Sequence, residues 1–137
     1  MPQLSPRLAE AVAALPLAPH LRVLEIGCGP GAAARAVAGH VPAIDRSAVA
    51  VARARAACAE EIASGRLTAR QCAAEDFVPE PGEGPFDLVF AFRVGALDGR
   101  RPEAGRRAVA RVAAALAPAG RVFVDGGDPL RELPVPR

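Results

Sequence analysis

Three glycines at alternate positions, Gly27, Gly29 and Gly31, directly follow a short apolar run. An acidic residue, Glu25, lies two positions before the first of them. Glycine has no Cβ and adopts positive φ without strain, so a backbone built from it turns sharply and lets a ligand lie against it. The alanine-rich run after Gly31 predicts a helix whose N-terminus points at that ligand. The segment therefore indicates a turn that binds a nucleotide, with an adenosine-type ligand lying against its backbone.

Apolar runs that alternate with helical patterns surround this turn. The patterns predict strands over 23–26, 41–44, 67–72, 86–90 and 121–124, and helices over 8–15, 31–38, 48–63 and 103–116, with a turn over 118–120. Strands that alternate with helices require right-handed crossovers and a parallel sheet. We therefore expect an α/β fold, with a doubly wound, mainly parallel sheet of about five strands and flanking helices, in a single domain over residues 1–137.

Ligands of such sheets bind at the carboxyl ends of the strands. Polar residues expected at those ends are Glu25, Asp45, Glu75, Asp76, Arg93, Asp125 and Asp128. His20 and His40 precede strands and should lie at the opposite end. We therefore expect neither histidine to be catalytic.

The composition narrows the class of protein. Hydrophobic residues make up 51% of the 137 residues and charged residues 23%, which is typical of a globular protein. No apolar stretch reaches membrane-spanning length and the first residues do not resemble a signal peptide, so we expect a cytoplasmic protein without membrane contact. The 17 basic residues are all arginines spread along the chain, and Trp and Tyr are absent, so nucleic-acid binding is not expected. The three cysteines and two histidines lack metal-ligand spacing, and we expect no metal site.

Five segments together resemble the class I methyltransferases that use S-adenosylmethionine, over about residues 8–128. VLEIGCGPG (23–31) is similar to the first motif of that family, and AIDRS (43–47) to the second. AAEDF (73–77) resembles the loop that contacts adenine. FDLVFAFRV (86–94) and LAPAGRVFVDGG (116–127) resemble its fourth and fifth strands. The chain ends soon after the fifth, so we expect it to lack the C-terminal antiparallel strand pair of the full fold.

The resemblance implies S-adenosyl-L-methionine as the cofactor and assigns its contacts. Glu25 would fix the methionine end, with the backbone at Gly27 and Gly29 close beneath it. Asp45 would accept hydrogen bonds from both ribose hydroxyls. The full set of expected cofactor-binding residues is Glu25, Gly27, Gly29, Asp45, Arg46, Ala74 and Glu75.

The expected function is methyl transfer to a small-molecule acceptor, for which the sequence designates no catalytic residue. Arg93 is either an anchor for an anionic substrate group or a solvated loop arginine, and its residue type favours the second interpretation. Asp125 and Asp128 are candidate bases with the same alternative. Two other functions stay open: an NAD-binding oxidoreductase, because Gly27, Gly29 and Ala32 also fit the dinucleotide pattern, and a non-catalytic protein that binds S-adenosylmethionine.

The tail over residues 126–137 contains three prolines and is expected to be irregular. The last strand, 121–124, would then have an unpaired edge, which proteins usually cover. Either a homodimer buries this edge or the tail folds over it, and we favour the homodimer.

Overall fold

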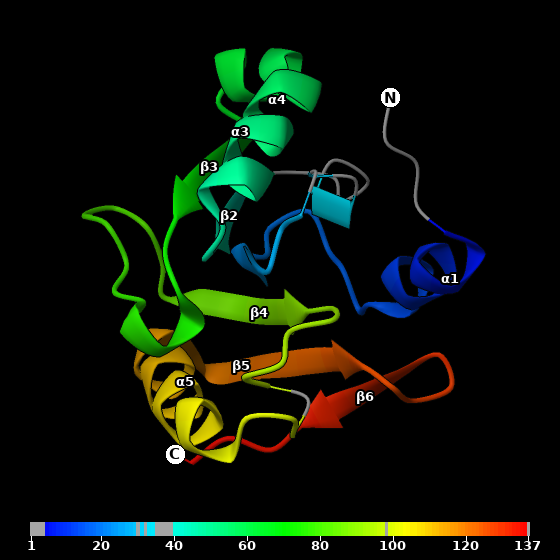
Figure 1. Cartoon of the computed structure of the whole chain (residues 1–137), viewed down its shortest axis with the longest axis vertical. Helices are drawn as coiled ribbons and strands as arrows, with labels where there is room; N and C mark the ends of the chain where they lie inside the picture. Colours follow the sequence, from blue (N-terminus) through cyan, green and yellow to red (C-terminus); the bar gives the residue numbers. More distant parts are fainter. Residues whose placement is uncertain (1–4, 30, 32, 35–39, 98, 137) are drawn as a thin grey trace.

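The computed structural model describes residues 5–29, 31, 33–34, 40–97 and 99–136. Six strands of this part form one sheet in the order β3-β2-β1-β4-β5-β6 (Figure 1). Strands β1 to β5 run parallel to their neighbours, and β6 is antiparallel to β5. The elements are α1 (Pro6–Ala14), β1 (Val23–Ile26), β2 (Val41–Asp45), α3 (Ala48–Ala57), α4 (Ala59–Ala63), β3 (Leu67–Gln71), the 3₁₀ helix η1 (Ala74–Asp76), β4 (Phe86–Ala91), α5 (Pro102–Ala115), β5 (Leu116–Asp125) and β6 (Leu130–Leu133).

The central strands are apolar on both faces because helices cover both faces. Successive side chains of a strand point to opposite sides, so Val23 packs with α1 and α3 whereas Leu24 packs with α5 and η1. Both residues are at most 3% exposed. Burial on two faces explains why these strands read as continuous apolar runs in the sequence. The doubly wound, mainly parallel sheet is therefore confirmed.

Ser5 and Ser47 are the N-cap residues of α1 and α3. The Ser5 hydroxyl accepts a hydrogen bond from the Leu8 N–H, and the Ser47 hydroxyl accepts one from the Ala50 N–H at 3.1 Å. Such N-caps satisfy backbone N–H groups that have no partner inside the helix. Ser47 thereby sets the start of α3 directly after β2.

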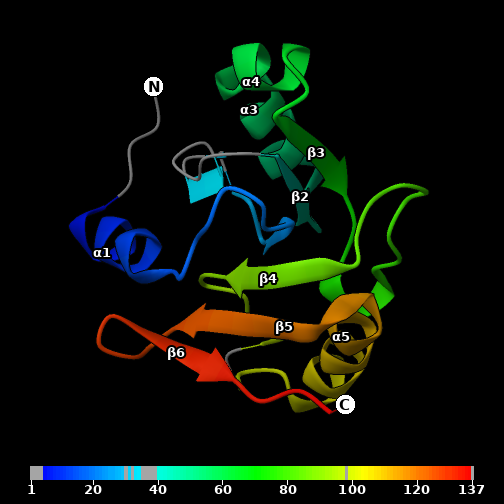
Figure 2. The ribbon, with the colours of Figure 1, turned by 180° about the vertical axis from the view of Figure 1, so that it is seen from behind.

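The C-terminal tail differs from the sequence prediction. Residues 130–133 form β6, whose register with β5 joins Val122 to Leu133 and Asp125 to Leu130. Pro129 and Pro134 flank this strand and do not interrupt it, so its ladder hydrogen bonds are kept. Figure 2 shows β6 beside β5 at the opposite edge of the sheet from β3. The prediction that β5 is the last strand, without an antiparallel neighbour, was wrong, and with it the reason given for a homodimer.

Two further elements inside the chain also differ from the sequence prediction. The single helix predicted over 48–63 is divided at Cys58, which is fully buried, has φ −111° and ψ 28°, and lies with its thiol 3.7 Å from the Gly31 carbonyl. The turn predicted over 118–120 lies inside β5 as an irregularity, where the β4–β5 register shifts between Phe86 and Leu88. The helix predicted over 31–38 lies largely outside the described residues. In the described part of the chain, no helix is long and apolar enough to cross a bilayer.

Candidate functional site

A cavity of about 800 Å³ opens at the carboxyl ends of the parallel strands. Side chains from the ends of β1 and β2, from η1, from the β4–α5 connection and from α1 line it. All seven residues that the sequence predicted for a cofactor lie in its wall: Glu25, Gly27, Gly29, Asp45, Arg46, Ala74 and Glu75. The fold thus places three separate segments of the chain around one space, as the rule for parallel sheets requires.

The glycine turn after β1 is held by β2. The N–H groups of Gly27 and Cys28 both donate to the Ile44 carbonyl, at 2.8 and 3.0 Å. Gly27 has φ +76° and Gly29 has φ +50°, a region that favours glycine. A Cβ on Gly27 would lie 2.5 Å from the Val94 side chain, which packs over the turn from the β4–α5 connection. At Gly27 the residue type is therefore required by both the backbone conformation and the packing.

Asp45, the last residue of β2, also holds the glycine turn by a hydrogen bond. Its Oδ2 accepts a hydrogen bond from the Gly29 N–H at 3.0 Å, and its Oδ1 accepts one from the Ser47 N–H at 2.8 Å. The N-cap of α3 is Ser47, so Asp45 is not the capping residue of that helix. Each carboxylate oxygen keeps a second lone pair, and the side chain is half-buried in the cavity wall. Asp45 therefore holds the turn while retaining the capacity to accept hydrogen bonds from a ligand.

Glu25 is the one buried charged residue of the described core, with 2% of its surface exposed. Burial raises its pKa well above the usual value, the N–H of Ala34 opposes this by hydrogen bonding, and the charge of Asp45 raises the pKa further. Its Oε1 has no hydrogen-bond partner among the described residues, although the side chain lines the cavity. A buried polar atom without a partner is costly, so this oxygen is suited to a ligand donor.

The third acidic position lies after β3. Ala73 is extended and is followed by η1, whose Ala74 is buried and whose Glu75 is half-buried. Ala74 and Glu75 line the cavity, whereas Asp76 is not part of its wall. Of the two acids that the sequence offered here, the structure brings Glu75 to the site.

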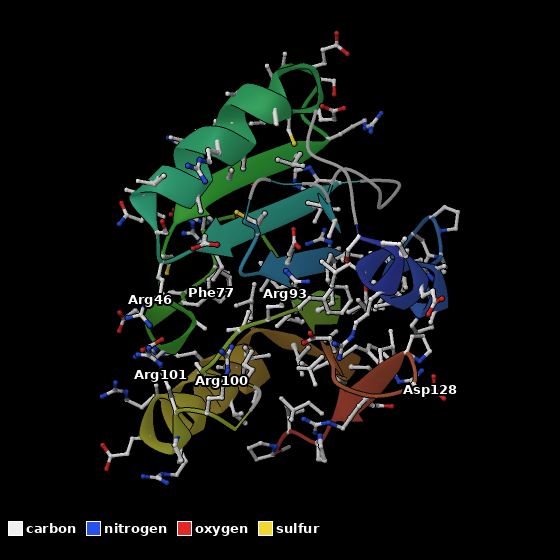
Figure 3. All side chains as sticks on the ribbon, turned by 45° about the vertical axis from the view of Figure 1, so that its right-hand side comes forward. Arg46, Phe77, Arg93, Arg100, Arg101 and Asp128 are labelled. Atoms are coloured by element: carbon white, nitrogen blue, oxygen red, sulfur yellow. The ribbon has the colours of Figure 1, made fainter. Side chains whose placement is uncertain are left out.

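Three arginines of the β4–α5 connection also line the cavity, and the sequence analysis identified only one of them. They are Arg93, Arg100 and Arg101. Figure 3 shows Arg100 and Arg101 beside α5, on the same side of the molecule as Arg46. A pair of adjacent arginines directly before a predicted helix, in a loop that follows a strand of this sheet, was the available signal.

The other candidates lie elsewhere. Asp125 accepts a hydrogen bond from the Arg93 N–H at 3.0 Å and is not in the cavity wall. Asp128 lies on the opposite side of the molecule from Arg101 (Figure 3). His40 contacts the Gly65 carbonyl and lines a second cavity of about 360 Å³ near the start of the strands, and His20 lines neither cavity. The structure thus does not bring either histidine or either C-terminal aspartate to the wall of the main cavity.

The cysteines lie at different depths. Burial is the main cause that raises the pKa of Cys28 to about 12, and burial also raises the pKa of the half-buried Cys72. Both line the cavity, whereas Cys58 is fully buried behind it. In the described part of the chain, no three side chains of the metal-ligating types form a cluster.

Comparison with known proteins concerns the family and the fold of the chain. No curated protein matches the chain. Among solved structures, the Haemonchus contortus phosphoethanolamine N-methyltransferase 2, in complex with S-adenosyl-L-methionine, is 28% identical, with a TM-score of 0.69 over 86% of this chain and 27% of that one. The [4+2]-cyclase SpnF is 29% identical, with a TM-score of 0.69 over 86% of this chain and 43% of that one.

The glycopeptide N-methyltransferase MtfA, solved with S-adenosyl-L-methionine, is 23% identical, with a TM-score of 0.69 over 85% of this chain and 48% of that one, and shows the shared fold. The chain thus spans about half or less of the length of these proteins. The family described as the methyltransferase domain matches residues 23–120. Because this match covers well over half of the sequence, the chain belongs to the methyltransferase-domain family.

Proposed function

We propose that residues 1–137 form one domain that binds S-adenosyl-L-methionine and transfers its methyl group to a small-molecule acceptor. The observation that carries the proposal is the unpartnered Oε1 of Glu25, buried in the same cavity wall as the glycine turn and Asp45. Two of the similar structures named above contain S-adenosyl-L-methionine, which supports the same ligand here.

The residues of the wall suit the different parts of this cofactor. Glu25 would accept hydrogen bonds from the amino group of the methionine end, and the glycine turn leaves space for the chain beneath it. Asp45 would accept from the ribose hydroxyls, and Ala74 with Glu75 would contact the adenine. S-adenosylmethionine supplies an activated methyl group on a sulfonium that is already a good leaving group.

The part left to the protein is orientation and exclusion of water. Leu8, Ala33 and Phe92 give part of the cavity wall an apolar surface, which would help to keep water from bound groups. Fixing an acceptor against a bound reactant can lower the barrier by roughly 7–11 kcal/mol. No acid–base residue is assigned, because Asp125 and both histidines lie outside the wall of the cavity.

Two alternatives make different predictions. An NAD-binding oxidoreductase would bind NAD in place of S-adenosylhomocysteine, the product of methyl transfer. A non-catalytic domain would bind S-adenosylmethionine without transferring its methyl group. One of the similar structures is named a [4+2]-cyclase, so a chain of this fold can have a named activity other than methyl transfer.

Isothermal titration with S-adenosylmethionine, S-adenosylhomocysteine and NAD tests these functions. We expect both sulfur-containing ligands to bind, NAD to bind weakly or not at all, and Asp45→Ala to weaken binding by more than about tenfold, since each charge-assisted hydrogen bond contributes roughly 1.5–3 kcal/mol. Asp128→Ala is the matched control, because Asp128 lies on the opposite side of the molecule from Arg101 of the cavity wall. This variant should bind both sulfur-containing ligands as the wild-type chain does.

A thermal melt shows whether Asp45→Ala remains folded, because this variant also loses two backbone hydrogen bonds. No binding of either sulfur-containing ligand by the folded wild-type chain would contradict the proposal. Tight binding without transfer of a labelled methyl group to any acceptor in a small-molecule panel would favour the non-catalytic alternative.

A further inference from the structure

We propose that the acceptor carries an anionic group, a carboxylate or a phosphate, which binds to Arg93 and Arg101 in the cavity. The inference rests on the proposed function, because only a methyl-transferring domain has an acceptor. It concerns the part of the cavity that the expected cofactor residues do not form. The evidence is that Arg93 and Arg101 line one cavity without a described protein partner, that Arg101 converges with Arg100, and that Arg93 has an unusual backbone conformation.

The side chains of two arginines in the β4–α5 connection, Arg100 and Arg101, converge over Gly95. A point placed at the missing Cβ of Gly95 is 3.6 Å from an Nη of Arg100 and 3.6 Å from the Nε of Arg101. Gly95, Arg100 and Arg101 all line the cavity together with Arg93. Like charges this close repel one another, so an anion between them would be stabilised.

Arg93 and Arg101 have no side-chain hydrogen bond or ion pair with any residue that the structure describes. Several other described arginines are held by protein groups. Arg70 pairs with Glu80 at 2.7 Å, and Arg121 pairs with Glu132 at 2.7 Å. Arg55 donates two hydrogen bonds to the Ala69 carbonyl. Arg93 and Arg101 therefore keep their donor capacity for a ligand, and a guanidinium matches the two oxygens of a carboxylate or phosphate.

Arg93 has a backbone that is unusual for its residue type. Its φ is +61°, and it is the only described residue other than glycine with a positive φ. The Asp125 carboxylate holds this conformation by accepting a hydrogen bond from the Arg93 N–H at 3.0 Å. A glycine would adopt this conformation without strain, so the strain at an arginine points to a function of its side chain. That side chain lines the cavity.

The charges of the cavity are separated along the sheet. Its acids, Glu25, Asp45 and Glu75, come from the ends of β1 and β2 and from η1. Arg93 and Arg101 come from the connection after β4, on the other side of β1 from β2. An acceptor that lies beside the cofactor therefore meets cationic groups on the β4 side, and among the described residues Arg46 is the only arginine that lines the β2 side.

The test uses small probes that share a phenyl ring and differ in the charge of the attached group: phenyl phosphate, benzoate, neutral benzyl alcohol and cationic benzylamine. Their binding to the chain, with and without S-adenosylhomocysteine, is measured by ligand-observed NMR titration. We expect both anions to bind more tightly than the other two, with an affinity that falls as salt concentration rises. Arg93→Gln and Arg101→Gln should each weaken anion binding by about tenfold.

Arg111→Gln is the matched control, because Arg111 is exposed on α5 and does not line the cavity. It should bind the anions as the wild-type chain does. Arg93→Gly provides a second variant in case the Gln variants do not fold, since glycine accepts the backbone conformation. It should also lose anion binding.

Unchanged anion binding in folded Arg93 and Arg101 variants, or tighter binding of benzylamine, would overturn the anion site. Normal binding of S-adenosylhomocysteine by these variants is expected and shows that the cofactor region is intact. Absence of that binding in the wild-type chain contradicts the proposed function, whereas the anion titrations still decide the arginine site by themselves.

Discussion

Glu25 is an acidic side chain held where water does not reach it. Burial raises its pKa well above the usual value, because an ionised carboxylate there loses its hydration. In the unfolded chain the same carboxyl group titrates near its ordinary pKa of about 4.3. Between these two pKa values the folded state binds a proton that the unfolded state has released, so Glu25 makes stability fall as pH rises.

Glu25→Gln should remove this contribution to the pH dependence. The unfolding temperature of the wild-type chain should include a decline as pH rises above the ordinary carboxyl pKa of about 4.3, and the variant should lack it because glutamine does not titrate. Thermal melts across this range measure the difference. Glu103→Gln, at an acid of α5 whose side chain is 89% exposed, should follow the wild-type curve. Parallel curves for wild type and Glu25→Gln would show that Glu25 titrates normally.

The contact between Gly27 and Val94 joins the turn after β1 to the connection after β4. Val94 packs where a side chain at position 27 would lie, so the two loops that border the cavity are fitted to each other. Gly29, in the same turn, has open space around its missing Cβ. The two glycines therefore separate the effect of packing from the effect of backbone conformation.

Gly27→Ala should destabilise the fold by about 2–4 kcal/mol, because a Cβ adds overpacking to the strain of positive φ. Gly29→Ala should cost only the conformational part, roughly 1–2 kcal/mol. Chemical denaturation measures both. Adding Val94→Ala to Gly27→Ala should recover part of the loss. Equal losses for the two single variants would mean that the Val94 contact is unimportant.

The strands around the site were predictable from the sequence because each is a local apolar run between turn residues. The three acids and two glycines predicted for the cavity, Glu25, Asp45, Glu75, Gly27 and Gly29, follow from the same pattern, since they lie at the carboxyl ends of strands or shortly after them. β6 was missed because the prolines of the tail suggested irregular structure. Only the pairing with β5 shows that residues 130–133, between Pro129 and Pro134, form a regular strand. The paired residues lie only 5 to 11 positions apart, but composition alone does not show that they pair.

The arginine site depends on contacts that sequence spacing does not reveal. Arg93 owes its conformation to Asp125, which is 32 residues away. Arg100 and Arg101 meet over Gly95 because of the path of one loop. A sequence pattern identifies such residues as charged loop positions, and the folded chain is needed to show which of them converge.

Across the whole molecule, β6 covers the edge of β5 that would otherwise be open. Deleting residues 127–137 should expose that edge and increase self-association, because unpaired N–H and C=O groups pair with other chains. Light scattering at tens of micromolar measures this. The control is Arg121→Gln with Glu132→Gln, which removes the exposed ion pair between β5 and β6 and should change stability by less than about 1 kcal/mol. A truncated chain that scatters like the full one would show that β6 has no protective role.

The three thiols make the occupancy of the cavity measurable by covalent labelling. At pH 8 a pKa of about 12 leaves only about one Cys28 side chain in ten thousand as the reactive thiolate, and Cys58 is sealed from solvent. Iodoacetamide should therefore alkylate Cys72 first, and mass spectrometry of peptides should show this reaction slowing when a ligand fills the cavity. Faster labelling of Cys28 than of Cys72 would contradict this order. A cysteine that takes no part in the chemistry would then report ligand entry for any compound, without a known acceptor or an activity assay.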